Sequence, residues 1–117
     1  MGRRNDNLIL DKTLQFAVRI VHLYKYLNSK GEYVLSKQLL RSGTSIGANL
    51  REAIEGISKS DFIAKSYISL KEARETEYWL EILHLTEYIS DKEFKSINSD
   101  LSEILKILVT IIKNSKG

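Results

Sequence analysis

Two glycines lie in the middle of the chain without interrupting its helical pattern. Gly43 and Gly47 fall within the segment 41–53, RSGTSIGANLREA, and apolar residues continue at helical spacing on both sides. Each glycine costs roughly 1 kcal/mol relative to alanine in a helix interior. A helix that accepts this cost usually brings its backbone close to another element. We therefore expect Gly43, Gly47 and Ala48 to contact a second helix.

Four segments with helical periodicity account for nearly the whole chain. The first ends in the turn residues 28–31, and the second spans about 32–56. The third follows the capping sequence 58–61 and continues to about 89, and the fourth follows a second capping sequence at 90–93. Because short connections make successive helices antiparallel neighbours, the sequence predicts an all-α, up-down-up-down four-helix bundle. We expect one domain over 1–117, with loose ends at 1–7 and 114–117.

The first helix carries more apolar surface than one bundle face needs. Two adjacent stripes run along it: Leu10, Leu14, Ala17, Val21 and Tyr24, and beside them Phe16, Ile20, Leu23 and Leu27. The sequence also predicts which residues the other three helices bury. On the second helix these are Val34, Leu35, Leu39, Ser42, Ile46, Asn49, Leu50 and Ala53, and on the third they are Ile63, Tyr67, Leu70, Ala73, Leu80 and Leu83. On the fourth they are Phe94, Ile97, Leu101, Ile104, Leu108 and Ile111, and the apolar face of this helix is made wider by Leu105, Val109 and Ile112. The surplus on the first and fourth helices predicts a closed homo-oligomer.

Three ordered blocks carry a resemblance to a known family. They are Gln38-Leu39-Leu40 leading into the glycine segment, Ser60-Asp61-Phe62-Ile63, and the segment 71–80, KEARETEYWL. Over roughly residues 9–113 the chain resembles the bacterial four-helix-bundle family named for proteins encoded inside intervening sequences of 23S rRNA genes. The resemblance implies ring-like homopentamers and, in one branch, an accessory factor that serves a reverse transcriptase and binds nucleic acid. It implies no settled biochemical activity.

The amino-acid composition indicates the cellular compartment and excludes some kinds of chemical site. The chain has no cysteine, which excludes disulfides and thiolate metal sites, and no proline to break its helices. Neither a signal core nor an apolar run of about 18 residues is present. We therefore expect a cytoplasmic protein that makes no membrane contact.

The net charge of +3 is unevenly distributed. Residues 1–60 carry ten Lys/Arg and five Asp/Glu, whereas residues 61–117 carry eight and ten. A basic first half is suited to polyanions, but the two halves could instead attract each other. The candidate nucleic-acid-binding residues are Arg3, Arg4, Lys12, Arg19, Lys37, Arg41 and Arg51. Such residues would bind phosphates with little sequence preference and strong salt dependence. No aromatic ladder accompanies them, so base stacking is not expected.

A second set of candidates is polar and lies on the facing sides of the second and third helices. It comprises Ser42, Ser45, Asn49, Glu72, Glu75 and Thr76. Such a set is either a ligand or catalytic site, or a structural network that fixes helix register. We favour the structural network because no nucleophile or base converges there.

No other pattern predicts an enzyme. Glu81-x-x-His84 is half of a carboxylate-bridged metal motif, but a ferritin-like site needs two such pairs plus two further glutamates. The spacings of Arg19 to His22 and Arg74 to His84 do not fit four-helix toxin ribonucleases, and no phosphate loop follows the glycines. We expect no catalytic residues, no metal and no cofactor.

The function that we predict is a non-enzymatic, homo-oligomeric nucleic-acid-binding accessory protein that contacts the RNA or DNA backbone. Its expected partners are other copies of itself, nucleic acid and a nucleic-acid-processing protein. The alternative is a protein-interaction scaffold that binds no nucleic acid. Binding that weakens steeply with salt would separate the two.

Overall fold

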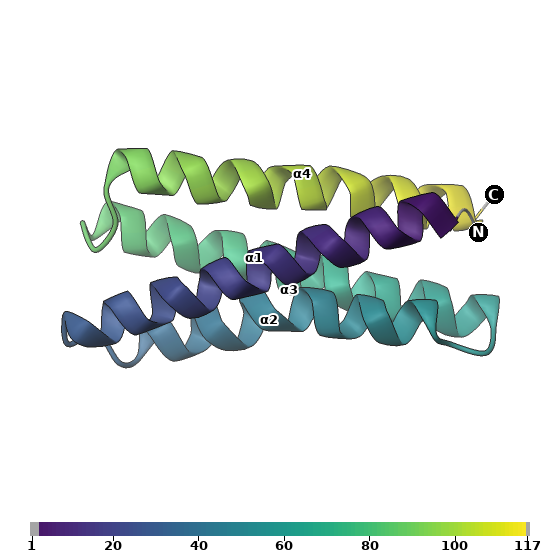
Figure 1. Ribbon diagram of the computed structural model, residues 1–117, viewed down its shortest axis with the longest axis horizontal. Helices are drawn as coiled ribbons and strands as arrows, with labels where there is room; N and C mark the ends of the chain where they lie inside the picture. Colours follow the sequence, from purple (N-terminus) through teal and green to yellow (C-terminus); the bar gives the residue numbers. More distant parts are fainter. Residues whose placement is uncertain (1–2, 117) are drawn as a thin grey trace.

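Four long helices run antiparallel to one another along a body of 44 × 21 × 19 Å (Figure 1). The computed structural model describes residues 3–116, with side chains from Asp6 onward. The helices are α1 (Arg3–Ser29), α2 (Leu35–Ile54), α3 (Lys59–Leu85) and α4 (Asp91–Lys116). The predicted all-α, up-down-up-down bundle is confirmed, and α1 and α4 extend into the end segments that we expected to be loose. No helix over the described residues is long and apolar enough to cross a membrane.

The first helix crosses the bundle obliquely. Its C-terminal end lies against the start of α2, where Ser36 donates a hydrogen bond to the Asn28 side chain at 3.1 Å. Its N-terminal end lies beside the end of α4, so that the two chain termini are close together (Figure 1). As a result α1 packs mainly on α2 and much less on α4.

The helix ends have identifiable local causes. Gly31 adopts a φ of 84°, and the Glu32 carboxylate then accepts backbone hydrogen bonds from Leu35 at 3.1 Å and Ser36 at 2.6 Å. This carboxylate caps the helix, so α2 begins at Leu35 and not at Glu32 as predicted. The third helix ends at Leu85, four residues before the predicted end, because Glu87 has a left-handed φ of 67°.

Both predicted capping sequences begin helices. The hydroxyl of Ser58 accepts a hydrogen bond from the backbone N–H of Asp61 at 3.0 Å, and Ser90 accepts one from Glu93 at 3.1 Å. A side-chain oxygen at this position satisfies one of the backbone donors that a helix start leaves free. These two serines fix where α3 and α4 begin.

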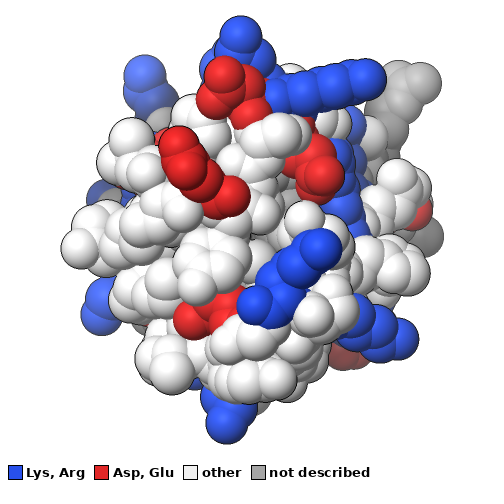
Figure 2. All heavy atoms as spheres, turned by 90° about the vertical axis from the view of Figure 1, so that its left-hand side faces the viewer, with Lys and Arg blue, Asp and Glu red and all other residues white. Residues whose placement is uncertain are grey.

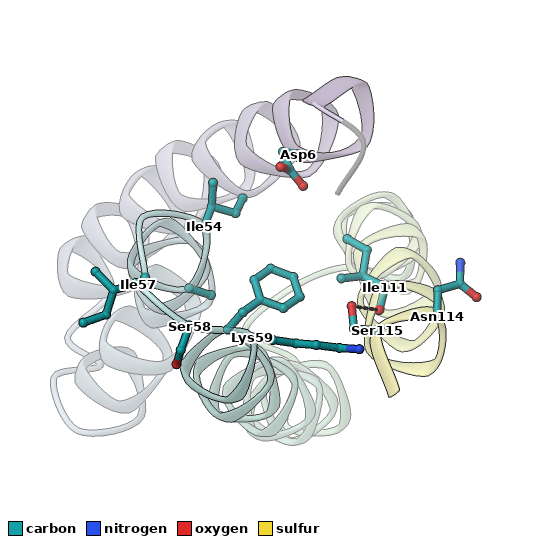
Figure 3. A pocket seen from close by; sticks show the side chains of 11 residues that line it. Asp6, Ile54, Ile57, Ser58, Lys59, Ile111, Asn114 and Ser115 are labelled. Carbon is teal, nitrogen blue, oxygen red and sulfur yellow. Dashed lines mark hydrogen bonds between the residues drawn. The ribbon is translucent and has the colours of Figure 1, made fainter. Parts of the chain in front are cut away.

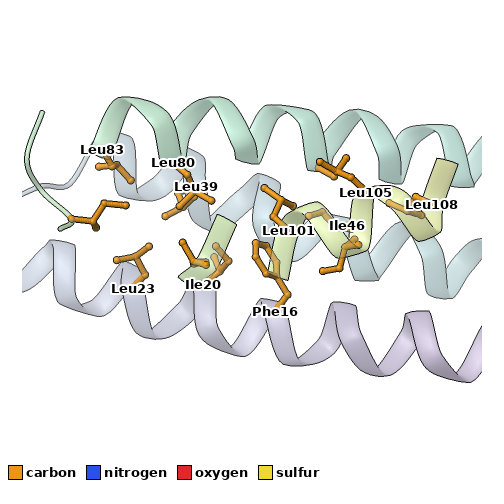
Figure 4. Close-up of a cluster of buried hydrophobic side chains, with 14 of the residues drawn as sticks. Phe16, Ile20, Leu23, Leu39, Ile46, Leu80, Leu83, Leu101, Leu105 and Leu108 are labelled. Atoms are coloured by element: carbon orange, nitrogen blue, oxygen red, sulfur yellow. The ribbon is translucent and has the colours of Figure 1, made fainter. Parts of the chain in front are cut away.

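The core uses the second apolar stripe of α1 and not the first. Phe16, Ile20 and Leu23 point inward and meet side chains from the other three helices (Figure 4). Leu14, in the first stripe, keeps 52% of its surface exposed. The oblique placement of α1 turns that stripe away from the bundle interior.

Three predictions of burial were wrong. Val34 is 73% exposed because it precedes α2, Tyr67 is 41% exposed on α3, and Val109 is 43% exposed on α4. The buried side of α3 is instead formed largely by small residues, including Ser66, Ser69 and Thr76. Small side chains let α2 and α3 approach closely, and Ser69 donates a 2.7 Å hydrogen bond to the backbone carbonyl of Ile46 on α2.

The glycines lie where two helices meet, as predicted. A Cβ atom on Gly43 would lie 2.8 Å from the Ile20 side chain, and one on Gly47 would lie 3.1 Å from Thr13 Oγ1. The second helix that they contact is α1. Ala48, by contrast, is exposed.

Candidate nucleic-acid interface

Three of the seven predicted basic residues are paired with carboxylates of other helices. Arg19 on α1 donates hydrogen bonds to Asp100 at 2.8 Å and to Ser96 at 2.7 Å, both on α4. Lys12 pairs with Glu103 along the same seam. These pairs join the basic first half of the sequence to the acidic second half.

The third paired residue is Arg41 on α2. Its guanidinium lies 3.2 Å from Glu72 and also pairs with Glu75, both on α3. A fourth cation, which was not among the candidates, shows the same behaviour: Lys65 lies 3.1 Å from Glu52. The ion pairs of Lys12, Arg19 and Arg41 therefore neutralise part of the charge asymmetry, whereas the pair of Lys65 and Glu52 joins a cation of the second half to an acid of the first.

The remaining four predicted residues are scattered. Lys37 and Arg51 are exposed and have no carboxylate within 4.0 Å among the described side chains. They lie fourteen residues apart on α2, roughly 21 Å along the axis. Arg3 and Arg4 belong to the first turn of α1, but their side chains lie outside the described residues. The five candidates whose side chains are described, Lys12, Arg19, Lys37, Arg41 and Arg51, do not form one continuous stripe.

A different surface collects five cations. We call it the outer α3–α4 face, and it comprises Tyr67, Lys71, Arg74 and Tyr78 on α3 with Lys106, Lys113 and Lys116 on α4. Within α3 the spacing of four, three and four residues places all four side chains on one side. On α4, Lys106 and Lys113 are two turns apart. All seven residues are exposed.

One contact ties the two helices of this face together. The Lys116 ammonium lies 4.7 Å from the centre of the Tyr67 ring, so the end of α4 lies beside the first half of α3. A cation over an aromatic ring is an attractive contact. It also places Lys113, three residues earlier on α4, near the same part of α3.

Acidic side chains are mostly directed away from the outer α3–α4 face. On α3, Glu72 and Glu75 lie toward α2, where they hold Arg41. On α4, Asp100 and Glu103 lie toward α1. Two carboxylates remain on this side of α3: Glu77 lies 3.6 Å from Arg74, and the exposed Glu81 follows Arg74 by two helical turns. The face therefore has more positive than negative charge.

This face was not predicted from the sequence, because the total charge of residues 61–117 is negative and does not show that basic residues gather on one side of α3 and α4. The signal was present in the order Tyr67, Lys71, Arg74, Tyr78, which places two basic residues between two aromatic ones at helical spacing.

The end of the bundle that carries the α1–α2 and α3–α4 turns differs from the outer α3–α4 face, because basic and acidic side chains are interspersed there (Figure 2).

The six polar candidates do not form a single network. Thr76 donates a hydrogen bond to Ser42 Oγ at 2.9 Å, and both side chains are buried between α2 and α3. Ser45 and Asn49 instead bond to backbone carbonyls of their own helix, at 2.5 and 2.8 Å. Two carboxylates complete the set and lie at the surface.

Those two carboxylates are held by partners outside the set. Glu72 binds Arg41, and Glu75 accepts a 2.9 Å hydrogen bond from the Trp79 indole in addition to its ion pair. Only Ser42 and Thr76 thus join α2 to α3 through buried side chains within this set.

The histidine of the half metal-binding motif Glu81-x-x-His84 contacts an aromatic ring and an aspartate. His84 stacks on Phe94 with ring centres 4.2 Å apart, and its Nε2 lies 2.6 Å from an Asp91 carboxylate oxygen. That hydrogen bond, together with the charge of His84, lowers the pKa of Asp91. Glu81 is exposed. No group of three or more possible metal ligands occurs among the described residues.

A cavity of about 650 Å³ opens at the end of the bundle where the chain termini lie. Ile54, Phe62 and Ile111 form its apolar interior, and Asp6 and Lys59 lie at its rim (Figure 3). The cavity exists because α1 leaves α2 to reach α4 at this end (Figure 1). Its lining holds no paired acid and base that could carry out a reaction.

Three large apolar side chains of α1 are exposed. Leu8, Leu14 and Val18 keep 46%, 52% and 50% of their surface exposed. A groove of about 380 Å³ lies beside Leu14 and is lined on the α2 side by Gly47 and Ala48 among others. Exposed apolar surface of this kind marks interaction sites.

Comparison with known proteins identifies the family. A sequence profile described as the 23S rRNA-intervening sequence protein matches residues 5–110. The chain belongs to this family. No protein with a curated description matches the chain.

A solved structure related to this intervening-sequence family supports the fold in detail. It is a protein with unknown function from the S23 ribosomal protein family of Bacteroides thetaiotaomicron VPI-5482, solved at 1.70 Å resolution. The two chains are 61% identical, with a TM-score of 0.91, and the match covers 93% of this chain and 98% of the other. The resemblance seen in the sequence is confirmed, and it assigns no activity. Function must therefore be inferred from the surface.

Proposed function

We propose that this intervening-sequence family protein is a non-enzymatic, self-associating accessory protein that binds the backbone of RNA or DNA. The observation that carries the proposal is the outer α3–α4 face. There Lys71, Lys106 and Lys113 are exposed and have no carboxylate within 4.0 Å among the described side chains. Unpaired cations on one face neutralise phosphates and release counterions, which favours binding without sequence preference.

Several basic residues predicted from the sequence remain candidates for a supporting role. Lys37 and Arg51 are unpaired among the described residues, and Arg3 and Arg4 lie in the first turn of α1, near the end of α4 (Figure 1). Lys12, Arg19 and Arg41 would each have to leave a carboxylate to bind a phosphate. For this reason the proposal rests on the outer α3–α4 face.

A role without catalysis is supported by the way the two histidines are used. His84 is engaged by Asp91 and Phe94, and this contact lowers the pKa of the Asp91 carboxyl. His22 lies on α1 without a carboxylate partner among the described side chains. A catalytic site would need a base and a nucleophile or substrate-binding groups held together.

Self-association is supported by the exposed apolar side chains of Leu8, Leu14 and Val18 on α1. Covering them with another copy would remove apolar surface from water, at about 25 cal/mol per Å². The family resemblance suggests a ring of five. A ring repeats the basic face in every subunit, so that weak phosphate contacts add through multivalency. A nucleic-acid-processing protein is the partner that we expect such an assembly to serve.

The test measures mass and binding on the intact protein. Light scattering is expected to give a multiple of the 13.4 kDa chain mass at micromolar concentration. Fluorescence anisotropy with a labelled RNA and a labelled DNA is expected to show binding at low salt that weakens steeply at about 200 mM salt. An oligomer that binds neither nucleic acid at low salt would support the alternative function, a protein-interaction scaffold. A monomer would refute self-association.

A further inference from the structure

We infer that the outer α3–α4 face is selective for single-stranded nucleic acid, with Tyr67 and Tyr78 as platforms on which unpaired bases stack. The inference rests on the proposed nucleic-acid binding and names the form of nucleic acid that the face fits. From the sequence we expected no base stacking, because no aromatic ladder accompanies the basic candidates of α1 and α2. The tyrosines proposed here lie instead beside the basic residues of α3 and α4.

The two tyrosines lie on one side of α3. Eleven residues separate Tyr67 from Tyr78, which is about three helical turns and roughly 16 Å along the axis. Lys71 and Arg74 lie between them on the same side, with Lys106 and Lys113 on the adjacent helix. A short stretch of single strand can thus reach both rings while its phosphates pass the cations.

Both rings are exposed and partly oriented. Tyr78 keeps 57% of its surface exposed, and its ring meets the edge of Trp79 at a centroid distance of 5.3 Å. Trp79 is itself fixed by its hydrogen bond to Glu75. On Tyr67, the Lys116 ammonium lies over the ring face, 4.7 Å from the ring centre, so a base that stacks on this face takes the place of that ammonium. Rings held in this way lose less conformational freedom when they bind.

Single strands fit this face better than duplexes do. In a duplex the bases are stacked and paired, so rings projecting from a straight helix would meet the backbone and gain no stacking. Unpaired bases expose their flat faces, and stacking on an aromatic side chain contributes independently of sequence. The face therefore combines two features of single-strand binders, namely cations for the backbone and aromatic rings for the bases.

A protein partner is the main alternative occupant, because tyrosine and arginine are also enriched in protein interfaces. The charge of the face favours an anionic occupant. Five cations, Lys71, Arg74, Lys106, Lys113 and Lys116, share it with two carboxylates on the same side of α3, those of Glu77 and Glu81. An extended polyanion is complementary to this arrangement.

The test compares a labelled single strand of about 20 nucleotides with the same sequence as a duplex, at one low salt concentration, by anisotropy. The variant Tyr67→Leu/Tyr78→Leu removes both rings but keeps apolar side chains. Tyr67→Phe/Tyr78→Phe keeps the rings. Tyr33→Leu is a matched control, because Tyr33 is also exposed but lies in the α1–α2 connection. Light scattering is run on every variant.

Wild-type protein is expected to bind the single strand roughly tenfold or more tightly than the duplex. The double leucine variant is expected to lose roughly 10- to 100-fold for the single strand and less than about twofold for the duplex. The double phenylalanine variant and Tyr33→Leu are expected to match wild type. The salt dependence of the leucine variant stays unchanged, since its phosphate contacts remain.

Four results would overturn the inference, and they differ in which part of the proposed function they would still allow. Equal binding of single strand and duplex by wild type, or equal weakening of both by the leucine variant, would remove the selectivity and leave phosphate binding intact. Loss of the oligomer in the leucine variant would show that the tyrosines are subunit contacts. Failure of wild type to bind either form would refute both the inference and the proposed function.

Discussion

Ser69 on α3 donates a 2.7 Å hydrogen bond to the backbone carbonyl of Ile46 on α2. A serine side chain is short, so this bond forms only where the two helix backbones approach closely. One turn earlier on the same buried side, Ser66 Oγ has no hydrogen-bond partner among the described atoms. Two serines three residues apart are thus equally buried and differently satisfied.

Replacing each of these serines with alanine is expected to have opposite effects. Ser66→Ala removes a buried hydroxyl that makes no hydrogen bond and improves helix propensity, so the free energy of unfolding should rise by up to about 1 kcal/mol. Ser69→Ala loses the bond to Ile46, and the free energy of unfolding should fall by about 1 kcal/mol. Urea denaturation of the two variants provides the measurement, and each serves as the control for the other. A loss of stability in Ser66→Ala would show that its hydroxyl is hydrogen-bonded after all.

The contact between Gly43 and Ile20 leads to a second prediction. A Cβ at position 43 would lie 2.8 Å from the Ile20 side chain, so Gly43→Ala must displace that side chain. Overpacking of this kind costs roughly 1–3 kcal/mol, against a gain in helix propensity of about 1 kcal/mol. We expect a net loss of up to about 2 kcal/mol in the free energy of unfolding.

Gly47→Ala is the matched control for this prediction, because its Cβ would lie 3.1 Å from Thr13, a less severe contact. Chemical denaturation is expected to rank Gly43→Ala below Gly47→Ala. If Gly43→Ala were more stable than wild type, the close packing of α1 on α2 at this position would be refuted.

The order and ends of the helices were largely predictable because they depend on neighbouring residues. Ser58 and Ser90 each cap a helix through a hydrogen bond to the residue three positions later. The buried side of α3 was not predictable in the same way. Periodicity favoured Tyr67, whereas the helices bury Ser69 and Thr76, because the close approach of α2 and α3 leaves room only for small side chains.

The candidate interface was harder to predict, because ion pairing is a property of the folded chain. Arg19 is 81 residues from its partner Asp100, and Lys12 is 91 residues from Glu103. No local pattern shows which cations are neutralised across such distances. The stripe from Tyr67 to Tyr78 could have been recognised, because it follows one helix and needs no tertiary information.

The hydrogen bond between His84 and Asp91 predicts a pH dependence. The pKa of Asp91 is lowered in the folded protein, first by this hydrogen bond and then by the charges of His84 and Lys95. The folded state therefore binds this proton less readily than the unfolded chain does. The resulting stabilisation is fully present above the unfolded value of about 3.9, and it is lost as the pH falls through the lowered pKa.

Asp91→Asn should accordingly lower the melting temperature at about pH 5 and have a smaller effect at about pH 2, where the wild-type carboxyl is protonated. In a His84→Gln background, the difference between the two pH values should shrink, because the main cause of the shift has gone. Thermal melts followed by circular dichroism supply the comparison. An effect of Asp91→Asn that is equal at both pH values would contradict this interpretation of the contact.

The placement of the nucleic-acid interface is tested most directly by the salt dependence of binding in two matched variants. One variant removes three cations of the outer α3–α4 face, Lys71→Gln/Lys106→Gln/Lys113→Gln. The other removes three cations that are paired between helices, Lys12→Gln/Arg19→Gln/Arg41→Gln. Both change the net charge equally, so any difference between them comes from where the charges lie. The slope of log affinity against log salt is measured with a labelled single strand.

We expect the outer-face variant to flatten that slope by about 0.7 for each phosphate that it no longer neutralises, and the variant of the paired cations to keep the wild-type slope. Unchanged binding by the outer-face variant would contradict the proposal. So would a slope that flattens only when the cations paired between helices are removed.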